Sequence, residues 1–107
     1  MKTIISEGEF RAITGASGIV LVDFYASWCE PCKWLDSILE SIHSSIPEGS
    51  SILKIDAELY VDLATEFEIR SVPVLLLFVD GEVVWRMNGF KTGPELLEVI
   101  HTFSRGT

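Results

Sequence analysis

The chain has 107 residues, of which 48% are hydrophobic and 22% are charged. This length and apolar fraction predict one packed domain over residues 1–107 and exclude a disordered chain. Sixteen acidic and eight basic side chains give a net charge of −8. That charge disfavours nucleic acid as a partner, because nucleic-acid phosphates bind basic surfaces.

The sequence also lacks the usual membrane and secretion signals. The longest apolar run, residues 72–79, has eight residues, whereas a membrane-spanning helix needs about 20. The first seven residues contain no apolar stretch of the kind found in a secretory signal. We therefore expect a soluble, cytoplasmic protein without a membrane partner.

The first half of the chain predicts a short helix, a strand and a longer helix. Ser6 and Glu9 have capping-box spacing, which predicts a helix from there to about Ile13. Residues 19–25 are continuously apolar apart from one aspartate, which is typical of a strand buried on both faces. Apolar side chains at helical spacing then predict a helix that ends before residues 47–49.

The second half predicts a strand over residues 51–56 and a helix over residues 58–68. A two-stranded hairpin follows, with strands over residues 74–79 and 82–87, and a last helix capped by Thr92 begins at residue 93. Strands separated by helices favour parallel pairing, and the hairpin adds an antiparallel strand. The predicted fold class is therefore α/β, with a central mixed β-sheet flanked by helices on both faces.

The two cysteines of the chain, Cys29 and Cys32, lie where the first buried strand gives way to a helix. Free backbone N–H groups and the positive end of the helix dipole are expected to lower the pKa of Cys29 there. A spacing of three residues in a helix brings both sulfurs to one side. This placement favours a reversible redox pair.

Three other interpretations of the cysteines are weaker. A structural zinc site needs four ligands, and the only further candidates, His43 and His101, have no zinc-finger spacing. A purely stabilising disulfide across so short a loop would remove only about 2 kcal/mol of chain entropy. The third interpretation is two unrelated buried cysteines.

Residues 22–33 resemble the active-site segment of the thioredoxin family. Residues 69–73 resemble its cis-proline loop, residues 78–82 its hairpin, and Gly89 the glycine that follows. The resemblance covers essentially the whole chain. It implies a single thioredoxin domain over residues 1–107 with the thioredoxin fold.

The resemblance implies a protein-disulfide oxidoreductase that reduces target disulfides by thiol–disulfide exchange. Cys29 would be the exposed nucleophile, and the deeper Cys32 would resolve the mixed disulfide. It implies no metal, no bound cofactor, a monomer, and a reductase partner, expected to be a flavoprotein that draws on NADPH. The alternatives are a thiol oxidase or isomerase in an oxidising compartment, and a redox-inactive interaction module.

Two charged residues have implied roles beside the cysteines. Asp23 interrupts the buried strand, so burial should raise its pKa, and the resemblance makes it the base for Cys32. Lys54 matches the buried lysine of the neighbouring strand, the expected partner of Asp23. The simpler interpretations are a solvated or backbone-bonded aspartate at a strand end and an exposed strand lysine.

The resemblance also implies a substrate-binding surface, made of Trp28, Glu30, Pro31, Val72, Pro73 and Gly89. The peptide bond before Pro73 is expected to be cis and to leave the Val72 backbone free to pair with a target peptide. Trp28 is expected at an exposed apolar rim, the alternative being plain core. Glu30 departs from the glycine usual in thioredoxins, and its carboxylate should raise the pKa of Cys29 and make the couple less oxidising.

Overall fold

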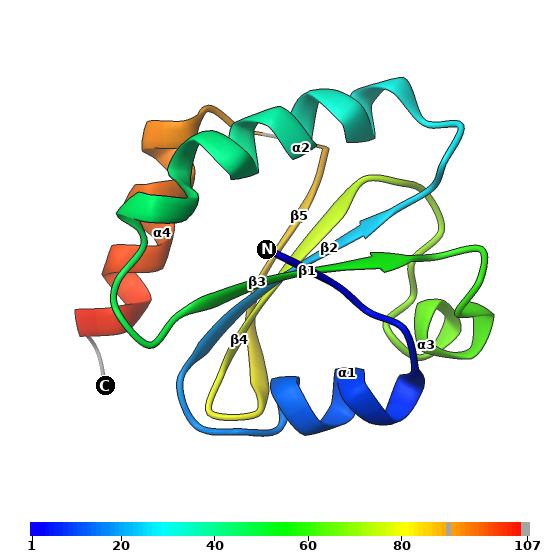
Figure 1. Cartoon of the computed structure of the whole chain (residues 1–107), viewed down its shortest axis with the longest axis horizontal. Helices are drawn as coiled ribbons and strands as arrows, with labels where there is room; N and C mark the ends of the chain where they lie inside the picture. Colours follow the sequence, from blue (N-terminus) through cyan, green and yellow to red (C-terminus); the bar gives the residue numbers. More distant parts are fainter. Residues whose placement is uncertain (90, 106–107) are drawn as a thin grey trace.

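A five-stranded mixed sheet runs through the centre of the molecule (Figure 1), as shown by a computed structural model that describes residues 1–89 and 91–105. Its strand order is β1-β3-β2-β4-β5. The bounds of the strands in chain order are β1 Lys2–Thr3, β2 Ile19–Tyr25, β3 Ser51–Asp56, β4 Val74–Val79 and β5 Glu82–Asn88.

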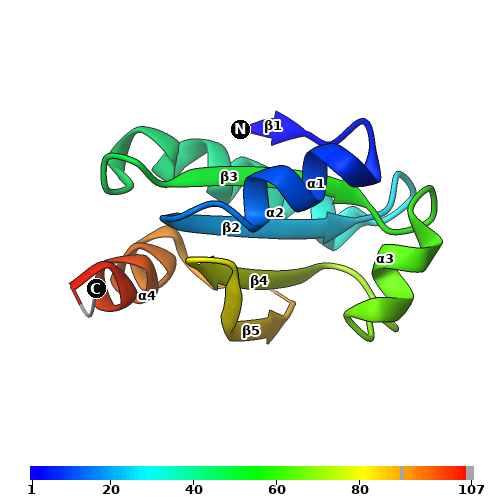
Figure 2. The same cartoon turned by 90° about the horizontal axis from the view of Figure 1, so that it is seen from below.

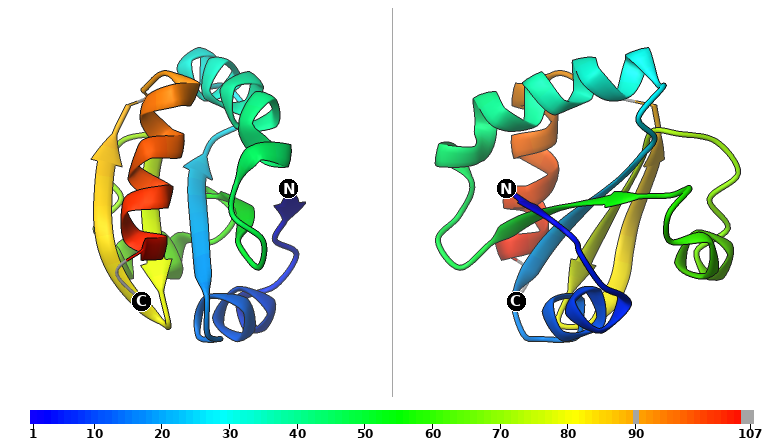
Figure 3. Two further views of the ribbon diagram at one scale, coloured as in Figure 1. Left: turned by 90° about the vertical axis from the view of Figure 1, so that its left-hand side faces the viewer. Right: turned by 45° about the vertical axis from the view of Figure 1, so that its right-hand side comes forward.

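Helices cover both faces of this sheet, as the sequence predicts (Figures 1 and 2). Helices α1 (Glu7–Thr14) and α3 (Val61–Glu66) lie on one face. The other face carries α2 (Glu30–Ile42), which continues into the 3₁₀ turn η1 (His43–Ser45), and α4 (Gly93–Arg105). Helices α2 and α4 also pack against each other (Figure 3).

Strand β2 separates two apolar cores, because successive side chains of a strand point to opposite faces. Val22 and Phe24 join the core under α1 and α3, where the rings of Phe10, Phe24, Phe67 and Phe78 pack edge to face or tilted. Leu21 points into the core under α2 and α4. By this alternation Asp23 belongs to the α2 side of the sheet, the side on which Cys32 lies.

The predicted direction of β4 is wrong, because β4 runs antiparallel to β2 rather than parallel. A parallel crossover must carry the chain back along the full strand, about 20 Å for six residues. Helix α3 has six residues and rises only about 9 Å. It stays at the end of the sheet where β3 finishes (Figure 1), so the chain re-enters the sheet from that same end.

Other element boundaries are close to those predicted. The predicted helix over residues 58–68 begins only at Val61, because the Asp56 carboxylate accepts hydrogen bonds from the Glu58 and Leu59 N–H groups at 2.8 and 3.3 Å. Strand β1 was not predicted, since two residues are too few to show a pattern. None of the helices in residues 1–89 and 91–105 is both long and apolar enough to cross a membrane.

The predicted caps and hairpin turn are confirmed. Ser6 Oγ accepts a hydrogen bond from the Glu9 N–H at 3.0 Å, and Thr92 Oγ1 accepts one from the Glu95 N–H at 3.3 Å. The β4–β5 turn places Asp80 and Gly81 at positive φ, as an Asp-Gly hairpin requires. These local signals fix where α1 and α4 begin and where β4 reverses.

Candidate active site

Cys29 and Cys32 form a disulfide at the N-terminal end of α2. The S–S distance is 2.33 Å and the two Cα atoms are 5.3 Å apart. Cys29 is the N-cap residue of α2, and its Sγ accepts a hydrogen bond from the Cys32 N–H at 3.1 Å. The sulfur of Cys29 therefore occupies the place of an N-cap oxygen, where backbone N–H groups and the helix dipole favour negative charge.

The expected exposure of Cys29 is wrong for this disulfide form. Cys29 is 2% exposed and Cys32 is 4% exposed, so neither cysteine is the more accessible by a useful margin. The cover over Cys29 comes from Val72, whose carbonyl oxygen lies 3.8 Å from Cys29 Sγ although the two residues are 43 positions apart. Burial of Cys29 thus depends on a loop that no local pattern around the cysteines reveals.

That loop contains the predicted cis peptide bond, between Val72 and Pro73, and the prediction is confirmed. Pro73 is buried, and its carbonyl accepts a hydrogen bond from the Gly89 N–H at 2.9 Å. Gly89 has a φ of 98°, a conformation that favours glycine. Among the described residues, the Val72 N–H and carbonyl form no backbone hydrogen bond.

Arg86 holds the start of the same loop. Its guanidinium donates hydrogen bonds to the carbonyl oxygens of Phe67 and Glu68, the latter at 2.8 Å. Glu68 has a φ of 54°, a left-handed conformation that is uncommon for a residue with a side chain. The loop that leads into Pro73 is therefore fastened at both ends, by Arg86 of β5 and by Gly89, which follows β5.

A surface of mixed polarity, with Trp28 as its large exposed apolar side chain, surrounds the covered disulfide. Trp28 is 66% exposed, which excludes the plain-core interpretation. Glu30 and Pro31 are also exposed. A hollow of about 210 Å³ lies beside Trp28. Its lining is mixed, with apolar side chains such as Ile69 and Val72 next to the charged Glu58 and Arg70.

Asp23 is completely buried within β2. Neither of its carboxylate oxygens has a hydrogen-bond partner in the described part of the chain. Burial raises the pKa of Asp23, the charge of Lys54 lowers it in part, and the charge of Asp36 raises it; together these effects bring the pKa from 3.8 to about 7. The interpretation of Asp23 as a solvated or backbone-bonded residue at a strand end is therefore excluded.

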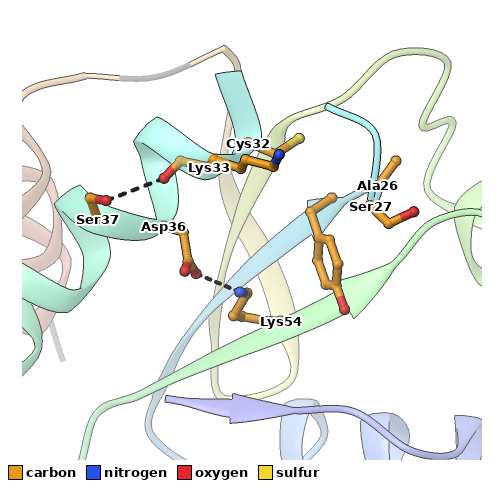
Figure 4. A pocket seen from close by; sticks show the side chains of 8 residues that line it. Ala26, Ser27, Cys32, Lys33, Asp36, Ser37 and Lys54 are labelled. Carbon is orange, nitrogen blue, oxygen red and sulfur yellow. Dashed lines mark hydrogen bonds and ion pairs between the residues drawn. The ribbon is translucent and has the colours of Figure 1, made fainter. Parts of the chain in front are cut away.

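Lys54 does not form the expected ion pair with Asp23. It lies beside Asp23 in the register of β2 and β3, but its Nζ binds Asp36 Oδ1 at 2.5 Å (Figure 4). The same ammonium lies 4.9 Å from the centre of the Tyr25 ring. Pairing with the partly exposed Asp36 costs less desolvation than pairing with a fully buried carboxylate.

Asp36 is the charged residue that the sequence reasoning missed. It follows Cys32 by one helical turn, and residues four apart lie on the same helix face. Together with Cys32, Lys54 and Tyr25 it lines an open pocket of about 390 Å³ (Figure 4). The i, i+4 spacing from Cys32 was the signal that could have identified it.

With this geometry established, the comparisons with known proteins identify the family. The thioredoxin family model matches residues 2–102. The chain belongs to the thioredoxin family. It is 42% identical to a thioredoxin of Chlamydia muridarum over 94% of this chain and 96% of the relative. It is 38% identical to a thioredoxin-like protein of Synechocystis over 85% of this chain and 87% of that one.

Solved thioredoxin structures agree with the fold. A thioredoxin mutant from Halobacterium salinarum superposes with a TM-score of 0.85 at 32% identity, covering 94% of this chain and 88% of the other. The thioredoxin fold and the family's redox-active cysteine pair are thus both present. The protein is a disulfide oxidoreductase whose dithiol is Cys29 and Cys32.

Glu30 lies between Cys29 and Pro31 in the cysteine motif. Its carboxylate binds Lys33 Nζ at 3.0 Å, and both side chains are more than 60% exposed. The adjacent positive charge and the solvent reduce the effect of Glu30 on Cys29.

Replacing Glu30 with glycine will make the couple slightly more oxidising, because a negative charge beside the thiolate is removed. The shift in midpoint potential will be at most about 20 mV, since exposed charge pairs contribute less than about 1 kcal/mol. Redox titration against a glutathione buffer measures it, with Glu40→Gly on the same helix as the control. An unchanged or more negative potential for Glu30→Gly would contradict the prediction.

Proposed function

We propose that this thioredoxin-family protein reduces disulfides in other proteins, with Cys29 as the nucleophile and Cys32 as the resolving thiol. The Cys29 thiolate attacks one sulfur of a target disulfide, which breaks that bond and expels the first target thiolate. Cys32 then attacks Cys29 Sγ, expels the second target thiolate and forms the Cys29–Cys32 disulfide. Two electrons pass from the protein to the target.

The position of Cys29 at the N-cap of α2 is the observation that carries this assignment. Its sulfur accepts the Cys32 N–H, so negative charge on Cys29 is stabilised both by that hydrogen bond and by the helix dipole. Cys32 lies within the first turn of α2, where its sulfur bonds that of Cys29. The order of attack therefore follows from which sulfur the helix stabilises as an anion.

Asp23 is proposed as the base that takes the proton of Cys32 before Cys32 attacks. A base works best when its pKa lies near the operating pH, and burial brings the pKa of Asp23 to about 7. Lys54 is proposed to act on this step through its charge, which lowers the pKa of Asp23.

The target is proposed to bind across the surface formed by Trp28, Glu30, Pro31, Val72, Pro73 and Gly89. The Val72 N–H and carbonyl supply the backbone hydrogen bonds of an added strand, and the Trp28 ring supplies apolar contact.

The electrons are proposed to come from a thioredoxin reductase, a flavoprotein that uses NADPH. We place the protein in the cytoplasm, because thiols are kept reduced in that compartment. It is proposed to act as a monomer. A couple that works as a reductant there needs a midpoint potential near or below that of the glutathione pool.

Insulin reduction with dithiothreitol tests the activity, and redox titration tests its direction. The wild-type protein will accelerate insulin precipitation well above the dithiothreitol background and will have a midpoint potential below about −200 mV. Precipitation at the background rate would contradict the oxidoreductase function, and a potential near −120 mV would favour an oxidase instead.

A further inference from the structure

Two carboxylates of this site compete for one ammonium group. Asp36 from α2 and Asp23 from β2 both interact electrostatically with Lys54 from β3. The ammonium forms an ion pair with Asp36 Oδ1 at 2.5 Å, whereas neither oxygen of Asp23 has a hydrogen-bond or ion-pair partner among the described residues. Lys54 is nevertheless the register neighbour of Asp23, so its side chain starts beside one carboxylate and ends at the other.

The surroundings of Asp23 leave few other groups that could compensate its charge. Tyr25 on β2 and Cys32 and Lys33 on α2 line the same pocket as Lys54 and Asp36. β4 and α4 contribute buried apolar side chains to this core, namely Leu75, Leu77, Leu96 and Ile100, and the charges that act on Asp23 are those of Lys54 and Asp36. The position of the Lys54 ammonium therefore dominates the balance of charge around Asp23.

We propose that Asp36 is a positioning residue for the dithiol reaction: it holds the Lys54 ammonium in the open pocket and keeps it from pairing with Asp23. The proposal rests on the proposed function, in which Asp23 must accept a proton from Cys32. A carboxylate held in an ion pair with Lys54 would be a weaker base. Asp36 thus keeps Asp23 able to take up a proton near neutral pH.

The Asp36–Lys54 pair has the geometry needed for this role. The side chains of Lys54 and Asp36 are only 20% and 32% exposed, so solvent screens their interaction less than it screens a surface pair. The ring of Tyr25, 4.9 Å from Nζ, gives the ammonium a second favourable contact in this position. Figure 4 shows the Lys54 side chain reaching Asp36 in this pocket.

The test is the titration of Asp23 in the oxidised protein, followed by carbon NMR of its carboxyl group. Asp36→Asn removes the competing charge and releases Lys54, so the midpoint of the Asp23 titration will fall by at least about one pH unit. Glu40→Gln, an exposed change on the same helix, is the matched control and will leave the midpoint in place.

A double-variant cycle separates positioning from the direct charge of Asp36. If Asp36 acts through the lysine, Asp36→Asn will shift the Asp23 titration much less in a Lys54→Met background than in the wild type. An unchanged midpoint in Asp36→Asn, or an equal shift in both backgrounds, would overturn the proposal.

The functional readout is the pH dependence of mixed-disulfide resolution. On the acidic side of this profile, the pH at which the resolution rate is half its maximum will be lower in Asp36→Asn, in parallel with the titration of Asp23. An unchanged half-maximum pH would overturn the link to catalysis. The NMR titration needs no turnover, so it reports on Asp36 even if the insulin assay shows no reductase activity. Failure of the proposed function and failure of this proposal are therefore distinguishable.

Discussion

Replacing Cys32 with serine will leave the protein covalently joined to its target, whereas replacing Cys29 with serine will prevent any covalent complex. The reason is the order of attack: Cys29 forms the mixed disulfide, and only the Cys32 thiolate can break it from within the protein. Both variants will reduce insulin no faster than dithiothreitol alone. Non-reducing electrophoresis after mixing with insulin measures the trapped complex.

The double variant Cys29→Ser and Cys32→Ser is the control for non-covalent adhesion to insulin. A trapped complex formed by Cys29→Ser but not by Cys32→Ser would reverse the assignment of nucleophile and resolving thiol. This outcome is a serious test, because the oxidised structure buries Cys29 and Cys32 to nearly the same extent and exposure does not distinguish them.

Replacing Asp23 with asparagine will stabilise the oxidised protein increasingly as the pH rises. The pKa of Asp23 is raised from 3.8 to about 7 in the folded protein, so between these values the folded state holds a proton that the unfolded chain has lost. The stabilising effect of that proton is complete below about pH 4 and is lost as the pH rises through about 7. The wild type thus carries a cost of about 4 kcal/mol at pH 8 that the variant lacks.

Urea unfolding at a series of pH values measures this difference. The stability of Asp23→Asn relative to the wild type will rise from pH 4 to pH 8 by a few kcal/mol, whatever constant penalty the buried amide adds. Glu48→Gln, an exposed change in a loop, will show no such trend. If the stability difference between Asp23→Asn and the wild type does not vary with pH, Asp23 titrates alike in the folded and unfolded states, and the prediction is wrong.

The sequence predicts the parts of the fold that local patterns encode. The continuous apolar run of β2, the capping residues Ser6 and Thr92 and the Asp80–Gly81 turn each act within a few residues, and each is confirmed. The direction of β4 was predicted wrongly because it depends on how far α3 carries the chain. That distance reflects the Asp56 side chain, whose hydrogen bonds delay the start of the helix.

In the candidate site, too, the sequence predicts the features that are local to one segment and misses those that depend on packing between segments. The cysteine pair and the burial of Asp23 were evident from the sequence, since both are properties of one strand–helix junction. The partner of Lys54 was not, because Asp23 and Asp36 are both acidic and only the packing of α2 over the sheet decides between them. The cover over Cys29 likewise comes from Val72, on a distant loop.

The two-sided burial of β2 gives the molecule separate regions for adjusting stability and chemistry. Phe24 faces the aromatic core under α1 and α3, while Asp23, its neighbour in sequence, belongs to the opposite layer. Substitutions that repack Phe10, Phe24, Phe67 and Phe78 therefore change the stability of the layer that lies across the sheet from Asp23.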